Sequence, residues 1–256
     1  MLRLLWLPLN IAQALFTAIW TGIWVTTALL IMAITRDRRI PLTMARTIWA
    51  PGLLWCARAK LDIRGRENVD FTQPHVFVSN HVSTIDIPAI FAAIPANVSF
   101  IIKKELKYAP FVGLFAWATG MTFVDRKETR GSLARLKRVG QVIAAGQSVI
   151  AFPEGTRNRE DTLLPFKKGA FFAGHQAGVP IVPVAIDGSR AVMPANSWAL
   201  RPGTIRVTFG EPIPTAGMSR HDSQVLPALA REAVAALRNR IPSENNAEKL
   251  GFGGKR

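Results

Sequence analysis

The sequence predicts an α/β fold: a mixed, largely parallel sheet flanked by helices, with an N-terminal membrane-associated helical hairpin in front of it. From residue 60 onward, short apolar runs alternate with segments of helical spacing, a pattern typical of a sheet covered by helices on both faces. The chain has 256 residues, 49% of them hydrophobic, which suffices for one ordinary domain with a packed core and a short appendage. The third observation is the N-terminus, where residues 4–34 contain no charged side chain.

Residues 4–34 predict one long apolar helix. If Pro8 opens it, the segment to Ile34 is about 40 Å long at about 1.5 Å per residue, longer than a hydrocarbon core of roughly 30 Å. We expect no cleavage as a signal peptide, because the apolar run continues well past a weak match at residues 12–14 and only Arg3 precedes it. The basic run at residues 36–39 closes the helix, and the positive-inside rule then places the rest of the chain in the cytoplasm.

A second apolar stretch, residues 48–57, is too short to span a membrane and is expected to break at Pro51-Gly52. Five of the seven tryptophans lie in the first 55 residues, as is typical near a membrane interface. We therefore predict that residues 1–59 anchor the chain to a membrane; the alternative is a buried hairpin packed on its own domain. Whether the long helix spans or lies in one leaflet stays open, because four polar side chains lie on it: Asn10, Gln13, Thr17 and Thr21.

Residues 60–241 are expected to form one α/β domain, followed by a disordered tail at residues 242–256. Its strands are predicted at residues 61–65, 75–79, 97–103, 121–124, 148–152, 180–186 and 203–210. Its helices are predicted at residues 84–94, 105–120 (broken), 128–147, 167–178 and 223–241. In such sheets the functional side chains lie on loops beyond strand ends, so polar clusters that follow different strands can meet.

The first polar cluster places His81 five residues before Asp86. Positions five apart in a helix lie about 140° around its axis, so the two side chains meet only if His81 precedes the helix and Asp86 is in its first turn. Ser83 or Thr84 would cap that helix. An aspartate on one ring nitrogen leaves the other as a proton acceptor, which makes His81 a candidate general base. The alternative is a structural histidine.

No protein nucleophile accompanies this pair. The sequence contains no G-x-S-x-G turn, and the single cysteine, Cys56, lies in the apolar hairpin, where it is expected to be a packing residue. The group that loses its proton could therefore be a hydroxyl of the substrate itself.

The second cluster, residues 152–157, follows another apolar strand. A glycine turn at Gly155 brings backbone N–H groups, the Thr156 hydroxyl and the Arg157 guanidinium to one point, which is typical of a phosphate site. Glu154 is expected to orient an arginine or a loop there. The segment is not a P-loop, because no G-K-[ST] follows; the alternative is an exposed turn with incidental charges.

Further cations follow two other strands. Asp125 and Arg126 end one of them, and alone they would be read as a surface ion pair. Lys103 and Lys104 follow the strand at residues 97–103. These lysines either neutralise a phosphate or merely solvate a helix start, and both interpretations stay open.

The formal net charge of +15 indicates an anionic partner: nucleic acid, a phospholipid surface or a phosphorylated substrate. Nucleic acid is disfavoured, because tyrosine occurs once and most tryptophans lie in the membrane segment. No metal is predicted, since His75, His175 and His221 are scattered without ligand spacing.

Four blocks in this order, residues 80–86, 120–126, 152–157 and 179–183, resemble the glycerophospholipid acyltransferase family, and within it the bacterial 1-acyl-glycerol-3-phosphate acyltransferases. The resemblance covers about residues 60–210. It implies transfer of an acyl group from acyl-CoA or acyl-carrier protein to the free sn-2 hydroxyl of 1-acyl-glycerol-3-phosphate, giving phosphatidic acid. No cofactor is implied beyond that acyl donor. It also implies anchoring at the cytoplasmic face of a bacterial inner membrane.

The resemblance carries residue roles with it. It implies that His81 is the general base and Asp86 its orienting partner, and that the acceptor phosphate is bound by Arg126, Glu154, Gly155, Thr156 and Arg157. An enzyme for another lyso-lipid, such as a lyso-aminolipid, stays open. A hydrolase, a non-catalytic lipid-binding protein and a nucleic-acid-binding protein are less favoured alternatives.

Overall fold

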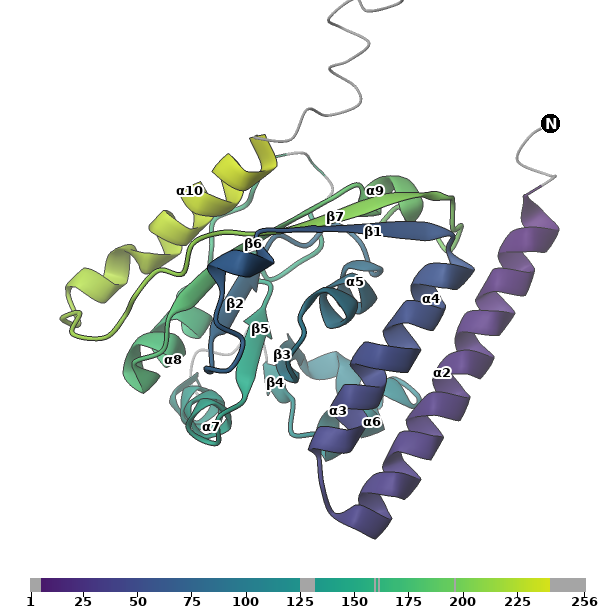
Figure 1. Cartoon of the computed structure of the whole chain (residues 1–256), viewed down its shortest axis with the longest axis horizontal. Coiled ribbons are helices and arrows are strands. Elements are labelled where there is room, and N and C mark those ends of the chain that lie inside the picture. Colours follow the sequence, from purple (N-terminus) through teal and green to yellow (C-terminus); the bar gives the residue numbers. More distant parts are fainter. Residues whose placement is uncertain (1–5, 125–131, 159, 161, 196, 240–256) are drawn as a thin grey trace, which may run out of the picture.

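The computed structural model describes residues 6–124, 132–158, 160, 162–195 and 197–239. Within these residues one sheet of seven strands runs in the order β1-β7-β6-β2-β5-β3-β4 (Figure 1). The strands are β1 (Ala59–Arg64), β2 (Val76–Ser79), β3 (Val98–Lys103), β4 (Thr122–Val124), β5 (Ser148–Ala151), β6 (Ile181–Asp187) and β7 (Gly203–Phe209). Neighbouring strands are parallel except β6 and β7. The predicted mixed, largely parallel sheet is confirmed.

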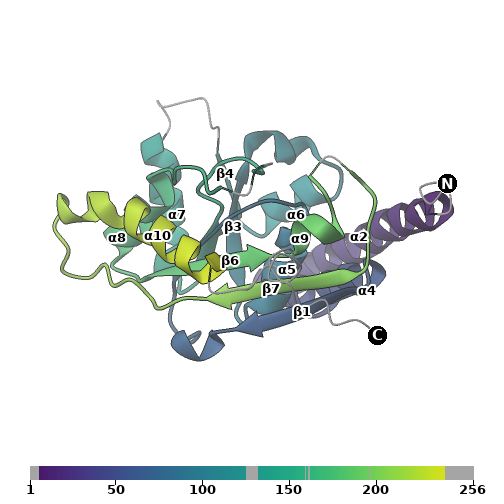
Figure 2. The same ribbon diagram turned by 90° about the horizontal axis from the view of Figure 1, so that it is seen from above.

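Helices cover both faces of this sheet, as Figures 1 and 2 show. One face carries α5 (Asp86–Ala93) and, outside it, the run of α3 (Arg39–Met44), the π-helical turn η1 (Ala45–Trp49) and α4 (Ala50–Cys56). The 3₁₀ turn η3 (Lys104–Tyr108) and α6 (Val112–Ala118) follow β3 and form the predicted broken helix. The other face carries α7 (Ser132–Ala144), α8 (Gly169–Ala177) and α10 (Leu226–Asn239). Short turns complete the chain: η2 (Arg66–Asn68), α9 (Ser189–Val192) and η4 (Asp222–Val225).

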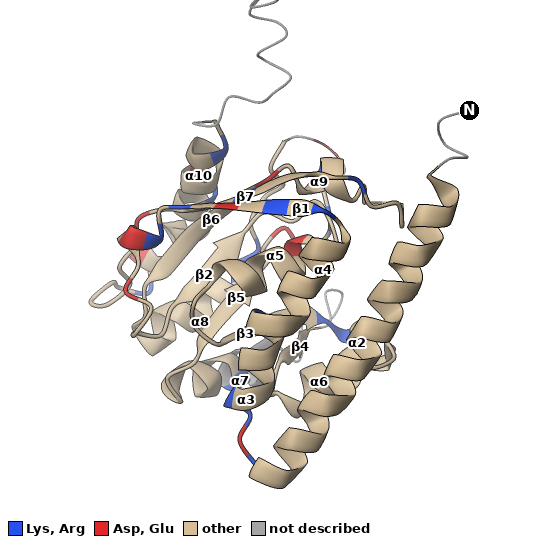
Figure 3. Cartoon of the chain, turned by 45° about the vertical axis from the view of Figure 1, so that its right-hand side comes forward, with Lys and Arg blue, Asp and Glu red and all other residues tan. Residues whose placement is uncertain are grey.

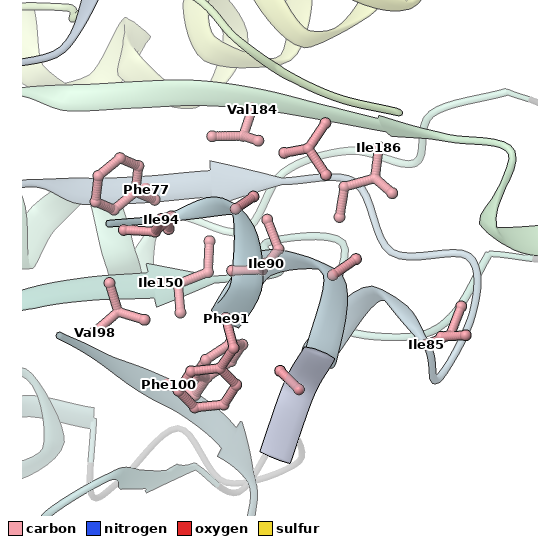
Figure 4. Packing of buried hydrophobic residues seen from close by; sticks show 14 of the residues in the cluster. Phe77, Ile85, Ile90, Phe91, Ile94, Val98, Phe100, Ile150, Val184 and Ile186 are labelled. Carbon is pink, nitrogen blue, oxygen red and sulfur yellow. The ribbon is translucent and has the colours of Figure 1, made fainter. Parts of the chain in front are cut away.

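The core between α5 and the sheet fixes the position of α5. Figure 4 shows Ile90 and Phe91 of this helix, and Ile94 directly after it, directed at side chains of β2, β3, β5 and β6, among them Phe77 and Phe100. Burial of each large apolar side chain favours this arrangement by about 1.5–3 kcal/mol. The amino end of α5 therefore lies just beyond the carboxyl end of β2.

The N-terminal helix α2 (Leu7–Thr35) packs along the α3–α4 run on the outside of the domain (Figure 1). Two of its polar side chains face the protein: Gln13 Nε2 donates to the Cys56 carbonyl at 2.9 Å, and Trp49 Nε1 donates to Thr21 Oγ1 at 3.1 Å. An apolar stripe faces outward, with Ile11, Leu15, Ile19 and Ile23 all exposed. By length and composition alone, α2 could cross a membrane.

The expected break at Pro51-Gly52 is wrong, because α4 runs through both residues. Pro51 lies in the first helical turn, where its missing N–H is not needed. Gly52 is required by packing, since a Cβ there would lie 2.4 Å from the Trp20 ring of α2. The backbone stays helical from Arg39 to Cys56, and the π-helical turn before Ala50 is the one irregularity between α3 and α4. The division into residues 1–59, 60–241 and 242–256 stays a prediction.

Candidate active site

The polar clusters predicted to meet follow the carboxyl ends of β2, β5 and β3, which are adjacent parallel strands and so share one edge of the sheet. His81 follows β2, Glu154 follows β5, and Lys103 ends β3. In the register of β3 and β4, Lys103 lies opposite Val124, the residue before Asp125. Asp125 and Arg126 themselves lie outside the described residues.

His81 and Asp86 form a hydrogen bond of 2.8 Å between Nδ1 and Oδ2. His81 lies in the turn after β2 and Asp86 is the first residue of α5, as the spacing requires. Asp86 is fully buried, and its Oδ2 also accepts the backbone N–H groups of Val82 and Ser83 at 2.8 Å each. The carboxylate can only accept, so Nδ1 carries the proton of the neutral ring and Nε2 keeps its lone pair.

The predicted cap of α5 by Ser83 or Thr84 is wrong, because the helix begins at Asp86 and no side chain caps it. Ser83 Oγ accepts the Ile85 N–H at 3.3 Å and donates to the Met193 carbonyl at 2.6 Å. Thr84 Oγ1 accepts from Arg157 Nη1 at 2.7 Å. Both hydroxyls in the turn are therefore engaged with other groups.

The segment at residues 152–158 holds His81 from three sides. The Phe152 ring stacks on the imidazole with centroids 4.1 Å apart and planes 17° apart. Glu154 Oε1 accepts the His81 N–H at 3.0 Å, and the Asn158 N–H donates to the His81 carbonyl at 2.8 Å. The two motifs lie 73 residues apart in sequence but form one rigid unit.

Glu154 is buried, and both of its oxygens accept hydrogen bonds from the chain. Besides the His81 N–H on Oε1, the Leu164 N–H donates to Oε2 at 3.1 Å, and Asn158 Nδ2 donates to the same oxygen at 3.3 Å. A buried carboxylate is tolerated when such donors surround it. This geometry favours the orienting role for Glu154 over direct contact with a phosphate.

Gly155 has a φ of +75°, in the left-handed region that favours glycine. The side chain of Lys167 lies across it: a Cβ on Gly155 would be 2.9 Å from Lys167 Nζ. The Lys167 N–H donates to the Pro153 carbonyl at 2.9 Å, which ties the lysine to this turn. Thr156, Arg157 and Lys167 are exposed, so one hydroxyl and two cations face solvent beside the His81 turn.

The lysines after β3 are placed differently. Lys103 Nζ forms an ion pair with Glu105 at 3.0 Å, and both side chains are exposed. Lys104 also has an interaction partner. The pairing of Lys103 with Glu105 favours the interpretation that these lysines solvate the start of η3. Their contact with a phosphate stays a prediction.

An apolar cavity of about 90 Å³ lies under the start of α5. Ile87, the residue after Asp86, lines it together with side chains from α2, α3, β3 and α6. Its lining is almost entirely apolar, so it suits a hydrocarbon group.

The sequence analysis gave no individual role to Asn80 and Phe152, which lie in the predicted blocks, and it did not identify Lys167. The buried Asn80 amide donates to the Ile186 carbonyl and accepts the Ile186 N–H, both at 2.8 Å, which pins the end of β2 to β6. An asparagine directly after a buried strand was the only local signal. Phe152 and Lys167 act through contacts distant in sequence.

The chain matches the profile of the Acyltransferase family over residues 60–187. It is 32% identical over 201 residues to the 1-acyl-sn-glycerol-3-phosphate acyltransferase alpha of Homo sapiens, covering 76% of this chain and 71% of that protein. It is 34% identical over 165 residues to the 1-acyl-sn-glycerol-3-phosphate acyltransferase of Saccharomyces cerevisiae, covering 62% and 54%. The corresponding alpha protein of Ovis aries is 36% identical over 172 residues, covering 67% and 59%. The chain thus spans about half to seven tenths of these relatives.

Among solved structures, the 1-acyl-sn-glycerophosphate (LPA) acyltransferase from Thermotoga maritima is similar to this chain with a TM-score of 0.78. The match covers 95% of this chain and all of the other, at 24% sequence identity. At that identity the likeness establishes the fold, including the helices that precede the sheet.

Proposed function

This chain belongs to the acyltransferase family, and we propose that it transfers a fatty acyl group from an acyl thioester to the sn-2 hydroxyl of 1-acyl-glycerol-3-phosphate, giving phosphatidic acid. The observation that carries the proposal is the His81–Asp86 pair, whose carboxylate is buried and whose neighbouring hydroxyls are engaged elsewhere. A base without a protein nucleophile suits direct attack by a substrate hydroxyl.

In the proposed reaction, His81 Nε2 takes the proton of the acceptor hydroxyl as its oxygen attacks the thioester carbonyl carbon. The tetrahedral intermediate then collapses, the carbon–sulfur bond breaks, and the leaving thiolate recovers the proton from the imidazolium. Asp86 stabilises that imidazolium through Nδ1. The Val82 and Ser83 N–H groups are already bonded to Asp86, so the oxyanion takes its donors from other groups.

The acceptor phosphate would bind beside this base, at the turn of Gly155. Support comes from the exposed Thr156 hydroxyl, the Arg157 guanidinium next to Thr84, and the ammonium of Lys167 over Gly155. We add Lys167 to the phosphate site and keep Arg126 in it by family resemblance. Glu154 would act through the His81 backbone, as a positioning residue.

An acyl chain would occupy the apolar cavity under α5, where Phe115 and Ala116 of α6 are among the lining residues. In that position, residues 111–117 would set the preferred length of the acyl chain. The outward apolar stripe of α2 would keep the active site at the membrane that holds the acceptor. We propose the cytoplasmic face of a bacterial inner membrane as the location, acyl-CoA or acyl-carrier protein as the donor, and no metal or further cofactor.

The test is an assay of the full chain in mixed micelles with radiolabelled acyl-CoA or acyl-carrier protein, and with lysophosphatidic acid, a lyso-aminolipid or no acceptor. Labelled phosphatidic acid from lysophosphatidic acid supports the proposal. Labelled product formed only from the lyso-aminolipid would show that the acceptor is a lyso-aminolipid and not lysophosphatidic acid. Labelled free fatty acid in every arm would contradict acyl transfer and indicate a hydrolase.

A further inference from the structure

A group of three arginines lies in a surface hollow of about 370 Å³, apart from the catalytic residues. It is formed where the end of α2, the turn before α3, the end of α6 and the middle of α7 come together. We call it the arginine hollow; it is lined by Met32, Arg36, Arg38, Trp117, Ala118 and Arg138. Its volume lies in the range of about 300–1,000 Å³ that is typical of ligand sites.

The arginine hollow lies at the opposite edge of the sheet from His81. Arg38 Nη1 lies 3.2 Å from the point where a Cβ on Gly120 would be, and Gly120 shortly precedes β4. This is the amino end of a strand parallel to β3, whereas the catalytic side chains follow carboxyl ends. The hollow is therefore a separate site.

The three guanidiniums carry charge that the described residues leave unbalanced. Each side chain is exposed, and no hydrogen bond or ion pair joins any of the three guanidiniums to the part of the chain that the structure describes. Asp37 lies in the same turn, where its Oδ1 accepts the Arg39 N–H at 2.8 Å. Three like charges gathered in one hollow favour an anion there, and guanidinium matches the geometry of phosphate with two parallel bonds.

The surroundings of the hollow are those of a membrane surface. Ile34, near the end of α2, is 83% exposed, and Trp117 in the hollow is 61% exposed. Figure 3 shows α2 without charge along its length and charged residues gathered at the turn that follows it. An apolar helix that ends in arginine next to tryptophan places those arginines at the depth of lipid headgroups.

We propose that the arginine hollow binds the phosphate of an anionic membrane phospholipid that is not a substrate, and so fixes how the molecule sits on the bilayer. The bound lipid lies with its phosphate between Arg36, Arg38 and Arg138 and its acyl chains along the exposed end of α2. This inference needs no turnover at His81, so it stands or falls separately from the acyl-transfer proposal.

The experiment compares sedimentation of the full chain with vesicles of phosphatidylcholine alone and of phosphatidylcholine mixed with phosphatidylglycerol, at physiological salt. The variant is R36Q/R38Q/R138Q, and the matched control removes three exposed charges away from α2 as R64Q/K168Q/R220Q. A cation near an anionic surface is worth about fivefold in affinity. The hollow variant should therefore lose about a hundredfold on the mixed vesicles. The control should lose far less, since charges beyond a Debye length of about 8 Å are screened.

Equal losses in the two triple variants would overturn the proposal, because they would show general attraction rather than a site. An unchanged hollow variant would also overturn it. R36K/R38K/R138K, which keeps the charge, should retain part of the binding. Turnover of the hollow variant in detergent micelles should stay unchanged and shows that it is folded. If the hollow variant has a raised KM for acyl-CoA or acyl-carrier protein but binds vesicles normally, the hollow binds the acyl donor, which would contradict the proposed binding of a membrane lipid.

Discussion

The two faces of the sheet are packed in different ways. On the face of α7, α8 and α10 the packing is tight: a Cβ on Gly174 would lie 2.6 Å from Ile181 and 3.2 Å from Val76. On the face of α5 the core contains the apolar cavity of about 90 Å³, and the same face carries the His81 ring, Asp86 and the N-terminal hairpin.

This difference indicates that the two faces of the sheet have different roles. The face of α7, α8 and α10 supports the strands, and the face of α5 holds the cavity proposed for the acyl chain, beside the His81–Asp86 pair. Changes on the α5 face should therefore alter catalysis or specificity, whereas matched changes elsewhere should alter stability alone.

Asp86→Asn should lower kcat by about 10³–10⁴-fold, because the amide disturbs the tautomer and the imidazolium loses its counter-charge. Steady-state acyl transfer in mixed micelles measures this. The control is Asp62→Asn, which removes a half-buried carboxylate of β1 that pairs with Arg64 and Arg206 and should leave kcat within a few-fold. A loss below tenfold for Asp86→Asn would argue against the orienting role.

Glu154→Gln should lower kcat by about 10–100-fold and leave the KM for the acceptor nearly unchanged. The glutamine amide would present a donor to one of the N–H groups that the carboxylate now accepts, which displaces His81 or Leu164. Measuring kcat and the acceptor KM separately distinguishes a positioning role from contact with the phosphate. Glu211→Gln, at an exposed position, is the control. A raised acceptor KM at unchanged kcat would instead show contact with the phosphate.

Ala116→Leu should shorten the preferred acyl chain, because Ala116 is buried and lines the apolar cavity. Ala173→Leu is the matched change on the other face, where Ala173 is equally buried. Ala173→Leu should cost about 1–3 kcal/mol of stability by overpacking, whereas Ala116→Leu should cost less because the cavity takes up part of the added volume. Competition between acyl-CoA lengths measures the preference, and identical profiles for the two variants would remove the distinction between the faces.

The smallest effect concerns stability at acid pH. Burial lowers the pKa of His75 below its ordinary 6.5, although a hydrogen bond to the Gln73 carbonyl opposes this. Below about pH 6.5 the unfolded chain binds a proton that the folded chain refuses, so stability falls as pH decreases toward the folded pKa. His75→Gln should flatten this slope in urea unfolding, and the exposed His221→Gln should not. An unchanged slope in His75→Gln would contradict the assignment.

Local patterns predicted much of this molecule. The strands were visible because buried parallel strands read as short apolar runs, and the His81–Asp86 contact followed from a five-residue spacing that admits one geometry across a turn. The meeting of distant polar clusters at one edge of the sheet was predictable, but the individual contacts between them were not. Nothing near Glu154 indicates that it accepts the His81 N–H, and Lys167 lies twelve residues beyond the glycine it covers. The break expected at Pro51-Gly52 failed because tertiary packing against Trp20 used the glycine inside a helix.

The most direct test of the account is acyl transfer to lysophosphatidic acid by wild type, His81→Ala and His175→Ala. His175 lies on α8, on the tightly packed face, with Nε2 2.9 Å from the Met218 carbonyl oxygen. We expect His81→Ala to lose about 10²–10⁴-fold of the turnover while His175→Ala stays close to wild type. Equal turnover in wild type and His81→Ala would contradict the assignment of the base and the reaction built on it.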